Sequence, residues 1–199
     1  MIVITNPSAI ANEISLIDSL FEEGLSLLHV RKPDFSEIEM VEFINQIKLE
    51  YRSKLVLHNH HQLAENFGIN RIHFSQKERK HDPDFPARFL KPCRYNSTST
   101  HSIEDFNSLE NFDYAFLSPV FSSISKEDYH PKEDLFEALK SRTNKKTKVI
   151  ALSGINSENI KKTLENGFDD VALLGTIWNH KNPIKQFKLC QKIVLSHSL

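Results

Sequence analysis

The chain has 199 residues, of which 39% are hydrophobic and 26% charged, and its formal net charge is −1. This composition predicts a soluble globular protein with no general attraction for nucleic acid or for a membrane surface, and no apolar run approaches the roughly 20 residues of a membrane span. The chain shows no basic leader or cleavage-like site, and its two widely separated cysteines, Cys93 and Cys190, favour a reduced, cytoplasmic setting.

Short apolar runs that are typical of buried strands alternate with segments of helical periodicity along the whole chain. In chain order, the expected strands are Ile2–Thr5, Leu25–Arg31, Leu55–Asn59, Arg71–Phe74, Cys93–Thr98, Tyr114–Val120, Val149–Leu152 and Val171–Leu174. The expected helices are Ile10–Phe21, residues 36–47, residues 102–109, Leu135–Lys140, Glu158–Asn166 and Pro183–Leu195. The connection Lys77–Pro92 is rich in proline and has only weak helical character.

Capping signals indicate where two of these helices begin and end. Ser36 and Glu39 have the spacing of a capping box. The apolar residues behind them recur at helical intervals, as Ile38, Val41, Ile44 (or Phe43) and Ile47. Asn156 or Ser157 is the expected cap of the helix that follows, and Gly167 stands where a glycine ends it.

The alternation of strands and helices predicts one domain over residues 1–199, a small (β/α)8 barrel of the TIM type. Parallel strands need crossover helices, and continuous apolar strands are covered on both faces. An open doubly wound sheet with fewer strands is the alternative. In a barrel the chemistry lies on the loops that follow the strands, so the polar groups at the strand ends are candidates for a site.

The loop Ser118–Lys126 follows the sixth expected strand and holds four serines and a lysine. Hydroxyl groups donate hydrogen bonds and an ammonium group supplies charge, so this loop is suited to binding an anion. Gly154 and Gly175 follow the seventh and eighth strands, where backbone N–H groups hold a phosphate in many barrels. The sequence therefore predicts a phosphate-containing ligand.

Histidines supply two further candidate functions. His101 follows the fifth strand and precedes a helix, a position suited to general acid and base catalysis. His58 and His60 lie two residues apart, so on a strand both would face one side and meet one metal, with Glu78 as a third ligand. A metal-dependent hydrolase built on that pair is one alternative that the sequence leaves open.

Taken together in chain order, these strand ends resemble those of the thiamine phosphate synthases and their relatives, the TenI-type thiazole tautomerases. The matching segments are His29-Val30-Arg31, Asn59 through Ala64, His73–Gln76, Ser99–Ser102, Ser118–Lys126 and Ser153-Gly154-Ile155. The resemblance covers nearly the whole chain and implies an enzyme that acts on a thiazole phosphate.

The resemblance also implies roles for individual residues. The substrate-binding residues would be Arg31, Asn59, Ser99, Ser123, Ser125, Gly154, Leu174 and Gly175. His101 and Lys126 would be catalytic. In a synthase the second substrate is a pyrimidine pyrophosphate bound with Mg²⁺, for which Glu78 would be a ligand. A tautomerase needs no cofactor.

The sequence departs from the synthases at the metal site. They follow the strand-three Asn with a metal-binding Asp, where this chain has His60, and their Lys two places beyond the strand-two Arg is replaced by Pro33, with Lys32 next to it. Because histidine is a poor Mg²⁺ ligand, the sequence favours a metal-free thiazole tautomerase in which His101 moves the proton. A thiamine phosphate synthase is the alternative, and a phosphate-binding barrel without turnover is a lesser one. A homodimer is left open.

Overall fold

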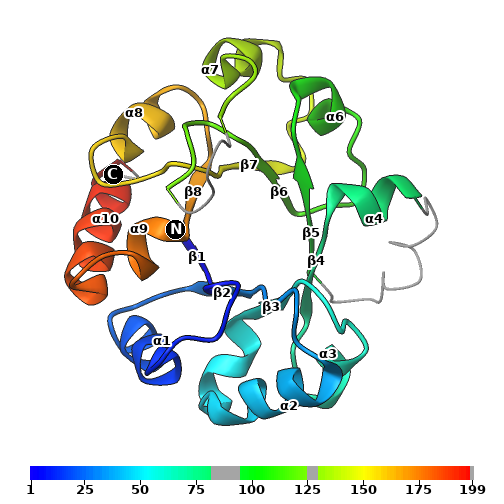
Figure 1. The fold of residues 1–199 in the computed structure, drawn as a ribbon. Helices are drawn as coiled ribbons and strands as arrows, with labels where there is room; N and C mark the ends of the chain where they lie inside the picture. Colours follow the sequence, from blue (N-terminus) through cyan, green and yellow to red (C-terminus); the bar gives the residue numbers. More distant parts are fainter. Residues whose placement is uncertain (82–94, 125–129, 198–199) are drawn as a thin grey trace.

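The computed structural model describes residues 1–81, 95–124 and 130–197 as a closed barrel of eight parallel strands with helices outside the ring (Figure 1). Each strand pairs with the next in the chain, and the eighth pairs with the first. The strands are β1 (Ile2–Ile4), β2 (Leu27–Val30), β3 (Leu55–Leu57), β4 (Arg71–Phe74), β5 (Tyr95–Thr100), β6 (Tyr114–Leu117), β7 (Lys148–Ala151) and β8 (Asp170–Leu173). The predicted barrel is confirmed, and the open sheet is excluded.

The helices form the outer layer. They are α1 (Glu13–Glu22), α2 (Glu37–Gln46), α3 (Leu63–Asn66), α4 (Gln76–His81), α6 (Ile103–Asn107), α7 (Leu135–Ala138), α8 (Ile160–Glu165), α9 (Gly175–Trp178) and α10 (Pro183–His197), with short 3-10 helices at Leu49–Lys54 and Leu139–Ser141. Within the described ranges no helix is both long and apolar enough to cross a membrane. Cys93, Ser125 and Lys126, and residues 82–92 of the proline-rich connection, lie outside those ranges.

Helix α2 shows how far local signals determine an element. Ser36 and Glu39 form the predicted capping box, with the Ser36 side chain accepting from the Glu39 N–H and the Glu39 side chain from the Ser36 N–H. The predicted apolar stripe is wrong at one position, because Ile38 is 72% exposed. The buried face consists of Met40, Phe43 and Ile44.

Helix α8 begins later than predicted. Its N-cap residue is Asn159, and Asn156 instead accepts a hydrogen bond from the Glu158 N–H in the preceding turn. The C-terminal prediction is confirmed, since Gly167 follows the helix with a φ of 99°, in the left-handed region that glycine adopts without steric cost.

The barrel interior is divided into an apolar half and a polar half. Strands β1, β6, β7 and β8 contribute a small apolar cluster of Ile2, Ile4, Tyr114, Phe116, Ile150 and Ala172. The polar half consists of His29 on β2, His58 directly after β3, His73 on β4 and two serines of β5. These side chains hydrogen-bond with one another or with Tyr114. A second and larger core lies between the strands and the helices. The polar half continues toward the carboxyl ends of the strands, where the candidate site lies.

Candidate active site

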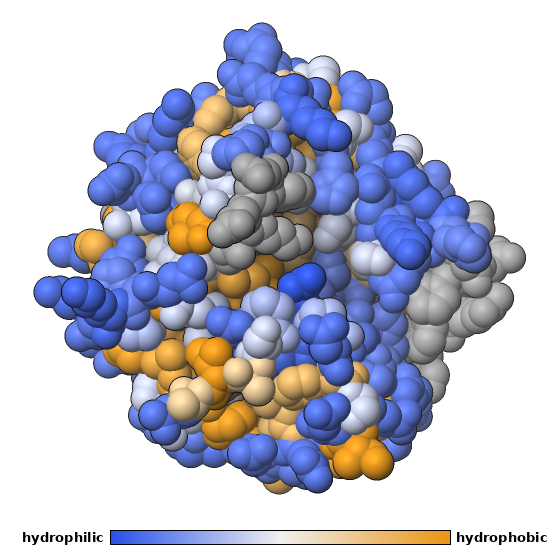
Figure 2. All heavy atoms as spheres, viewed as in Figure 1, coloured by the Kyte–Doolittle hydropathy of each residue, from blue (hydrophilic) through white to orange (hydrophobic). Residues whose placement is uncertain are grey.

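A cavity of about 380 Å³ lies at the carboxyl ends of the strands, near the centre of the face shown in Figure 2, where hydrophobic and hydrophilic residues meet. Seven of the predicted site residues line it, namely Arg31, Ser99, His101, Ser123, Gly154, Leu174 and Gly175. The structure thus brings together residues from five different strand ends, those of β2, β5, β6, β7 and β8. Their individual roles in binding and catalysis stay predictions.

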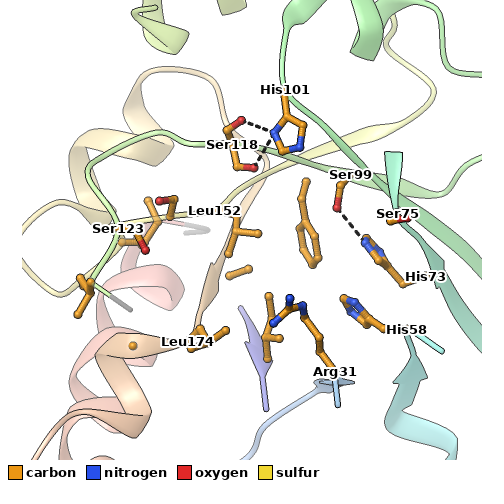
Figure 3. Close-up of a pocket in the computed structure, with 18 of the residues that line it drawn as sticks. Arg31, His58, His73, Ser75, Ser99, His101, Ser118, Ser123, Leu152 and Leu174 are labelled. Carbon is orange, nitrogen blue, oxygen red and sulfur yellow. Dashed lines mark hydrogen bonds between the residues drawn. The ribbon is translucent and has the colours of Figure 1, made fainter. Parts of the chain in front are cut away.

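The charged groups of the described cavity lining are all basic. Arg31 and Lys77 line it, and no Asp or Glu of the described ranges does. Figure 3 shows the Arg31 side chain reaching into the cavity opposite His101 and Ser118. The backbone behind it is fixed to the neighbouring strand, because the Arg31 N–H donates to Thr5 Oγ1 at 2.9 Å and that hydroxyl donates to the Arg31 carbonyl at 3.2 Å. A guanidinium group with no carboxylate among the described residues around it is suited to an anionic ligand.

His101 is held with one ring nitrogen toward the cavity. Its Nδ1 lies 2.8 Å from the carbonyl oxygen of Ser118. Because a carbonyl oxygen only accepts hydrogen bonds, Nδ1 carries the proton of the neutral ring, and Nε2 presents a lone pair. The residue that follows, Ser102, caps α6 by accepting from the Asp105 N–H. His101 is thus oriented to accept a proton from a ligand.

Gly154 and Gly175 form one edge of the cavity and pack tightly against the loop that follows β6. Ser153 and Gly154 both have left-handed φ values, of 84° and 67°, and the Phe121 N–H donates to the Ser153 carbonyl at 3.2 Å. A Cβ atom added to Gly154 would lie 2.5 Å from the Phe121 Cβ, and one added to Gly175 would lie 2.9 Å from Ile124 Cγ2. Glycine is therefore required at position 154, where backbone atoms lie close and φ is left-handed, whereas at position 175 the contact is with the Ile124 side chain.

The floor of the cavity contains two histidines, of which the sequence singled out only His58, and that one as a partner of His60. The rings of His58 and His73 line the cavity and stack with their centroids 4.1 Å apart (Figure 3). Beneath them His29 is fully buried, with Nδ1 2.8 Å from His58 Nε2 and Nε2 2.6 Å from the Tyr114 hydroxyl. The alternation of side chains along a strand was the available signal, since it turns His29 and His73 into the barrel interior.

Burial keeps these three rings neutral. Desolvation, followed by the nearby positive charge of other basic groups, lowers the pKa of His29 and His58 well below the usual range and that of His73 to about 3. The cavity floor is therefore uncharged near neutral pH, and the positive charge of the site is supplied by its rim.

Comparisons with known proteins agree with this arrangement. Residues 1–177 match the family model described as thiamine monophosphate synthase. This chain belongs to that family. The thiamine-phosphate synthase of Caldicellulosiruptor saccharolyticus is 26% identical over 175 residues, which cover 83% of this chain and 76% of the relative. A thiamine phosphate pyrophosphorylase from Bacteroides thetaiotaomicron is 31% identical in its crystal structure, with a TM-score of 0.76 over 98% of this chain and 96% of that one.

Further relatives extend the likeness. The thiamine-phosphate synthase of Staphylococcus haemolyticus is 25% identical over 84% of this chain and 82% of its own length. The thiamine phosphate pyrophosphorylase from Pyrococcus furiosus has a TM-score of 0.80 at 20% identity, which supports the fold alone. The predicted family, an enzyme family of thiamine biosynthesis, is thus confirmed.

Two residues that the family resemblance placed in the site do not line the described cavity. The amide nitrogen of Asn59 donates to the Lys32 carbonyl at 3.0 Å, and its oxygen is buried without a hydrogen-bond partner. Glu78 accepts a hydrogen bond from the Ser75 N–H at 2.7 Å at the start of α4. Local capping, which the resemblance could not reveal, accounts for the position of the Glu78 side chain.

The Mg²⁺ ion that the family implies has no ligand set among the described residues. His60 has a φ of 53°, which turns the chain after β3, and its Nε2 donates to the Phe35 carbonyl at 2.8 Å. The expected pairing of His58 and His60 on one face is wrong, because β3 already ends at Leu57. Asn59 and Glu78 alone do not form the oxygen cage that Mg²⁺ prefers.

Lys32, which adjoins the position of the family's missing lysine, does not serve as its substitute. Its ammonium group is fully buried, 2.6 Å from Glu13 Oε2 and 2.9 Å from the Ser8 carbonyl. The Phe35 and Phe43 rings lie 5.3 and 5.1 Å from it. The pair ties α1 to the end of β2 and takes Lys32 out of reach of an anion in the cavity.

Proposed function

We propose that this protein is a thiamine phosphate synthase, which joins a pyrimidine pyrophosphate to a thiazole phosphate and releases pyrophosphate. The observation that carries the proposal is a cavity with the Arg31 guanidinium inside it and no carboxylate among its described lining residues, in a chain whose relatives are named for this reaction. The relatives support the synthase over the thiazole tautomerase that the sequence favoured. The cytoplasmic location and a homodimer stay predictions.

In the proposed reaction the thiazole nitrogen forms a bond to the methylene carbon of the pyrimidine, and the bond from that carbon to the pyrophosphate oxygen breaks. Negative charge accumulates on the leaving pyrophosphate. Arg31 and the hydroxyls of Ser99 and Ser123 are the described groups that would stabilise that charge. Backbone N–H groups near Gly154 and Gly175 would hold the thiazole phosphate. The roles predicted for Ser125 and Lys126 fall outside the described residues.

The proposal is tested by incubating the purified protein with both substrates and MgCl₂ and measuring thiamine phosphate and released pyrophosphate. Arg31→Gln is expected to lower kcat/KM by about 100-fold or more, because it removes a charged donor from the developing anion. Lys161→Gln, which removes an exposed charge from α8, is the matched control and should leave the rate unchanged. Absence of coupling by the wild-type protein would contradict the proposal.

A thiazole tautomerase is the second candidate, and the orientation of His101 favours it. The Nε2 lone pair that His101 turns toward the cavity is suited to taking a proton from a ring carbon. Proton exchange into the thiazole substrate that is lost in His101→Gln, with no coupling by the wild type, would select this activity. Coupling that survives in His101→Gln would assign His101 no part in the synthase reaction.

A further inference from the structure

Three histidines converge inside the barrel, His29 on β2, His73 on β4 and His58 directly after the end of β3. One nitrogen from each of His29, His58 and His73 lies within 4.8 Å of the other two. Across residues 1–81, 95–124 and 130–197 this is the single group of three or more His, Cys, Asp or Glu side chains with that spacing. The group lies below the cavity, and His58 and His73 border it.

The hydrogen bonds around the cluster resemble those that orient metal ligands. His29 Nε2 lies 2.6 Å from the Tyr114 hydroxyl, while His73 contacts the Ser97 and Ser99 hydroxyls at 2.9 and 3.0 Å. A histidine that ligates a metal through one nitrogen usually has its other nitrogen fixed by such a partner. His29 can therefore present Nδ1 with its ring already oriented, and His73 can present either nitrogen while retaining one serine.

We propose that His29, His58 and His73 form a three-imidazole site for a divalent transition metal, with a fourth coordination position that opens into the cavity. The donor set selects the metal class: three imidazoles without a carboxylate suit Zn²⁺, Co²⁺, Ni²⁺ or Cu²⁺ and do not suit Mg²⁺. The fourth ligand is water or an anionic group of a molecule in the cavity, since Arg31 lines the same space and favours negative charge there.

The three ring nitrogens need to move only a little to coordinate one metal ion. Metal–nitrogen bonds of about 2.0–2.1 Å in a tetrahedral site place the ligand nitrogens about 3.4 Å apart. His29 Nδ1 and His58 Nε2, now 2.8 Å apart, must separate by roughly 0.6 Å, and the widest separation in the cluster must close from at most 4.8 Å. His58 is half-buried at the cavity edge, so its ring has room to turn, whereas His29 is held by Tyr114.

The proposal does not depend on the coupling reaction, and its test needs no substrate. Protein without a histidine tag is treated with EDTA, dialysed and titrated with CoCl₂ while the visible absorption of tetrahedral Co²⁺ is recorded. We expect one Co²⁺ per chain, displaced by one equivalent of Zn²⁺. His58→Gln and His73→Gln should each weaken Co²⁺ binding by about 100-fold or more, and Tyr114→Phe by about 10-fold through loss of the partner of His29.

His60→Gln is the matched control, because His60 lies two residues from His58 and faces the Phe35 carbonyl. It should leave the Co²⁺ spectrum unchanged. Circular dichroism confirms that each variant is folded, and a rise in Tm with Zn²⁺ in the wild type that is absent in His58→Gln gives a second readout. No tetrahedral Co²⁺ spectrum, or binding that is equally strong in His58→Gln and His60→Gln, would overturn the proposal.

Discussion

The tight packing of Gly154 against the loop after β6 leads to a sharp prediction for Gly154→Ala. The added Cβ would lie 2.5 Å from the Phe121 Cβ and 3.0 Å from its carbonyl carbon, whereas carbon atoms at optimal contact are about 3.5–4.0 Å apart. The loop that carries Ser123 must therefore move by about 1 Å. Gly68 supplies the matched control, because it has the same φ of 67° and nothing within 4 Å of an added Cβ.

Comparing Gly154→Ala with Gly68→Ala separates the cost of a left-handed φ from the cost of overpacking. Gly68→Ala places a side chain in the left-handed region and should lower the free energy of unfolding by about 1–2 kcal/mol. Gly154→Ala carries that cost and also the cost of overpacking, about 1–3 kcal/mol, so its total is about 2–5 kcal/mol. The additional loss has a local origin, because the displaced loop lines the cavity.

Urea unfolding followed by circular dichroism measures both free energies, and calorimetric titration with inorganic pyrophosphate measures binding in the cavity. We expect Gly68→Ala to bind pyrophosphate as the wild type does, and Gly154→Ala to bind it at least about 10-fold more weakly, as a displacement of about 1 Å in a binding loop implies. The reasoning is refuted if the two variants lose equal stability, within about 0.5 kcal/mol, and bind pyrophosphate equally well.

Two further predictions concern buried ionisable groups. Because the pKa values of His29, His58 and His73 are lowered in the folded state, the unfolded chain binds up to three more protons than the folded chain below pH 6.5. The free energy of unfolding should therefore be fully present above that pH and fall on acidification by about 1.4 kcal/mol per histidine per pH unit. Urea unfolding from pH 7 to pH 5 should show a shallower fall in His73→Gln than in the wild type. Lys32→Met leaves Glu13 buried without its cation and should lower the free energy of unfolding by about 3–5 kcal/mol, whereas the double variant Lys32→Met/Glu13→Leu should regain most of that loss. A double variant less stable than the single one would contradict this account of the pair.

The sequence by itself determined the barrel, because its signals are local. The period of the apolar residues distinguishes strands from helices, and the capping box of Ser36 and Glu39 acts within four residues. The strand ends then meet at one rim by the topology of a parallel barrel, so Arg31, His101 and Gly154 could be expected together.

Only the tertiary structure decided which of these side chains face the cavity. Lys32 and Glu78 are adjacent in sequence to site residues, yet a buried carboxylate and a helix cap hold them elsewhere. Conversely, His29, His58 and His73 are far apart in the chain and meet because β2, β3 and β4 are neighbours in the barrel, with His58 following the end of β3 between the other two strands. Local patterns specify elements, but the direction of a side chain depends on partners that are remote in sequence.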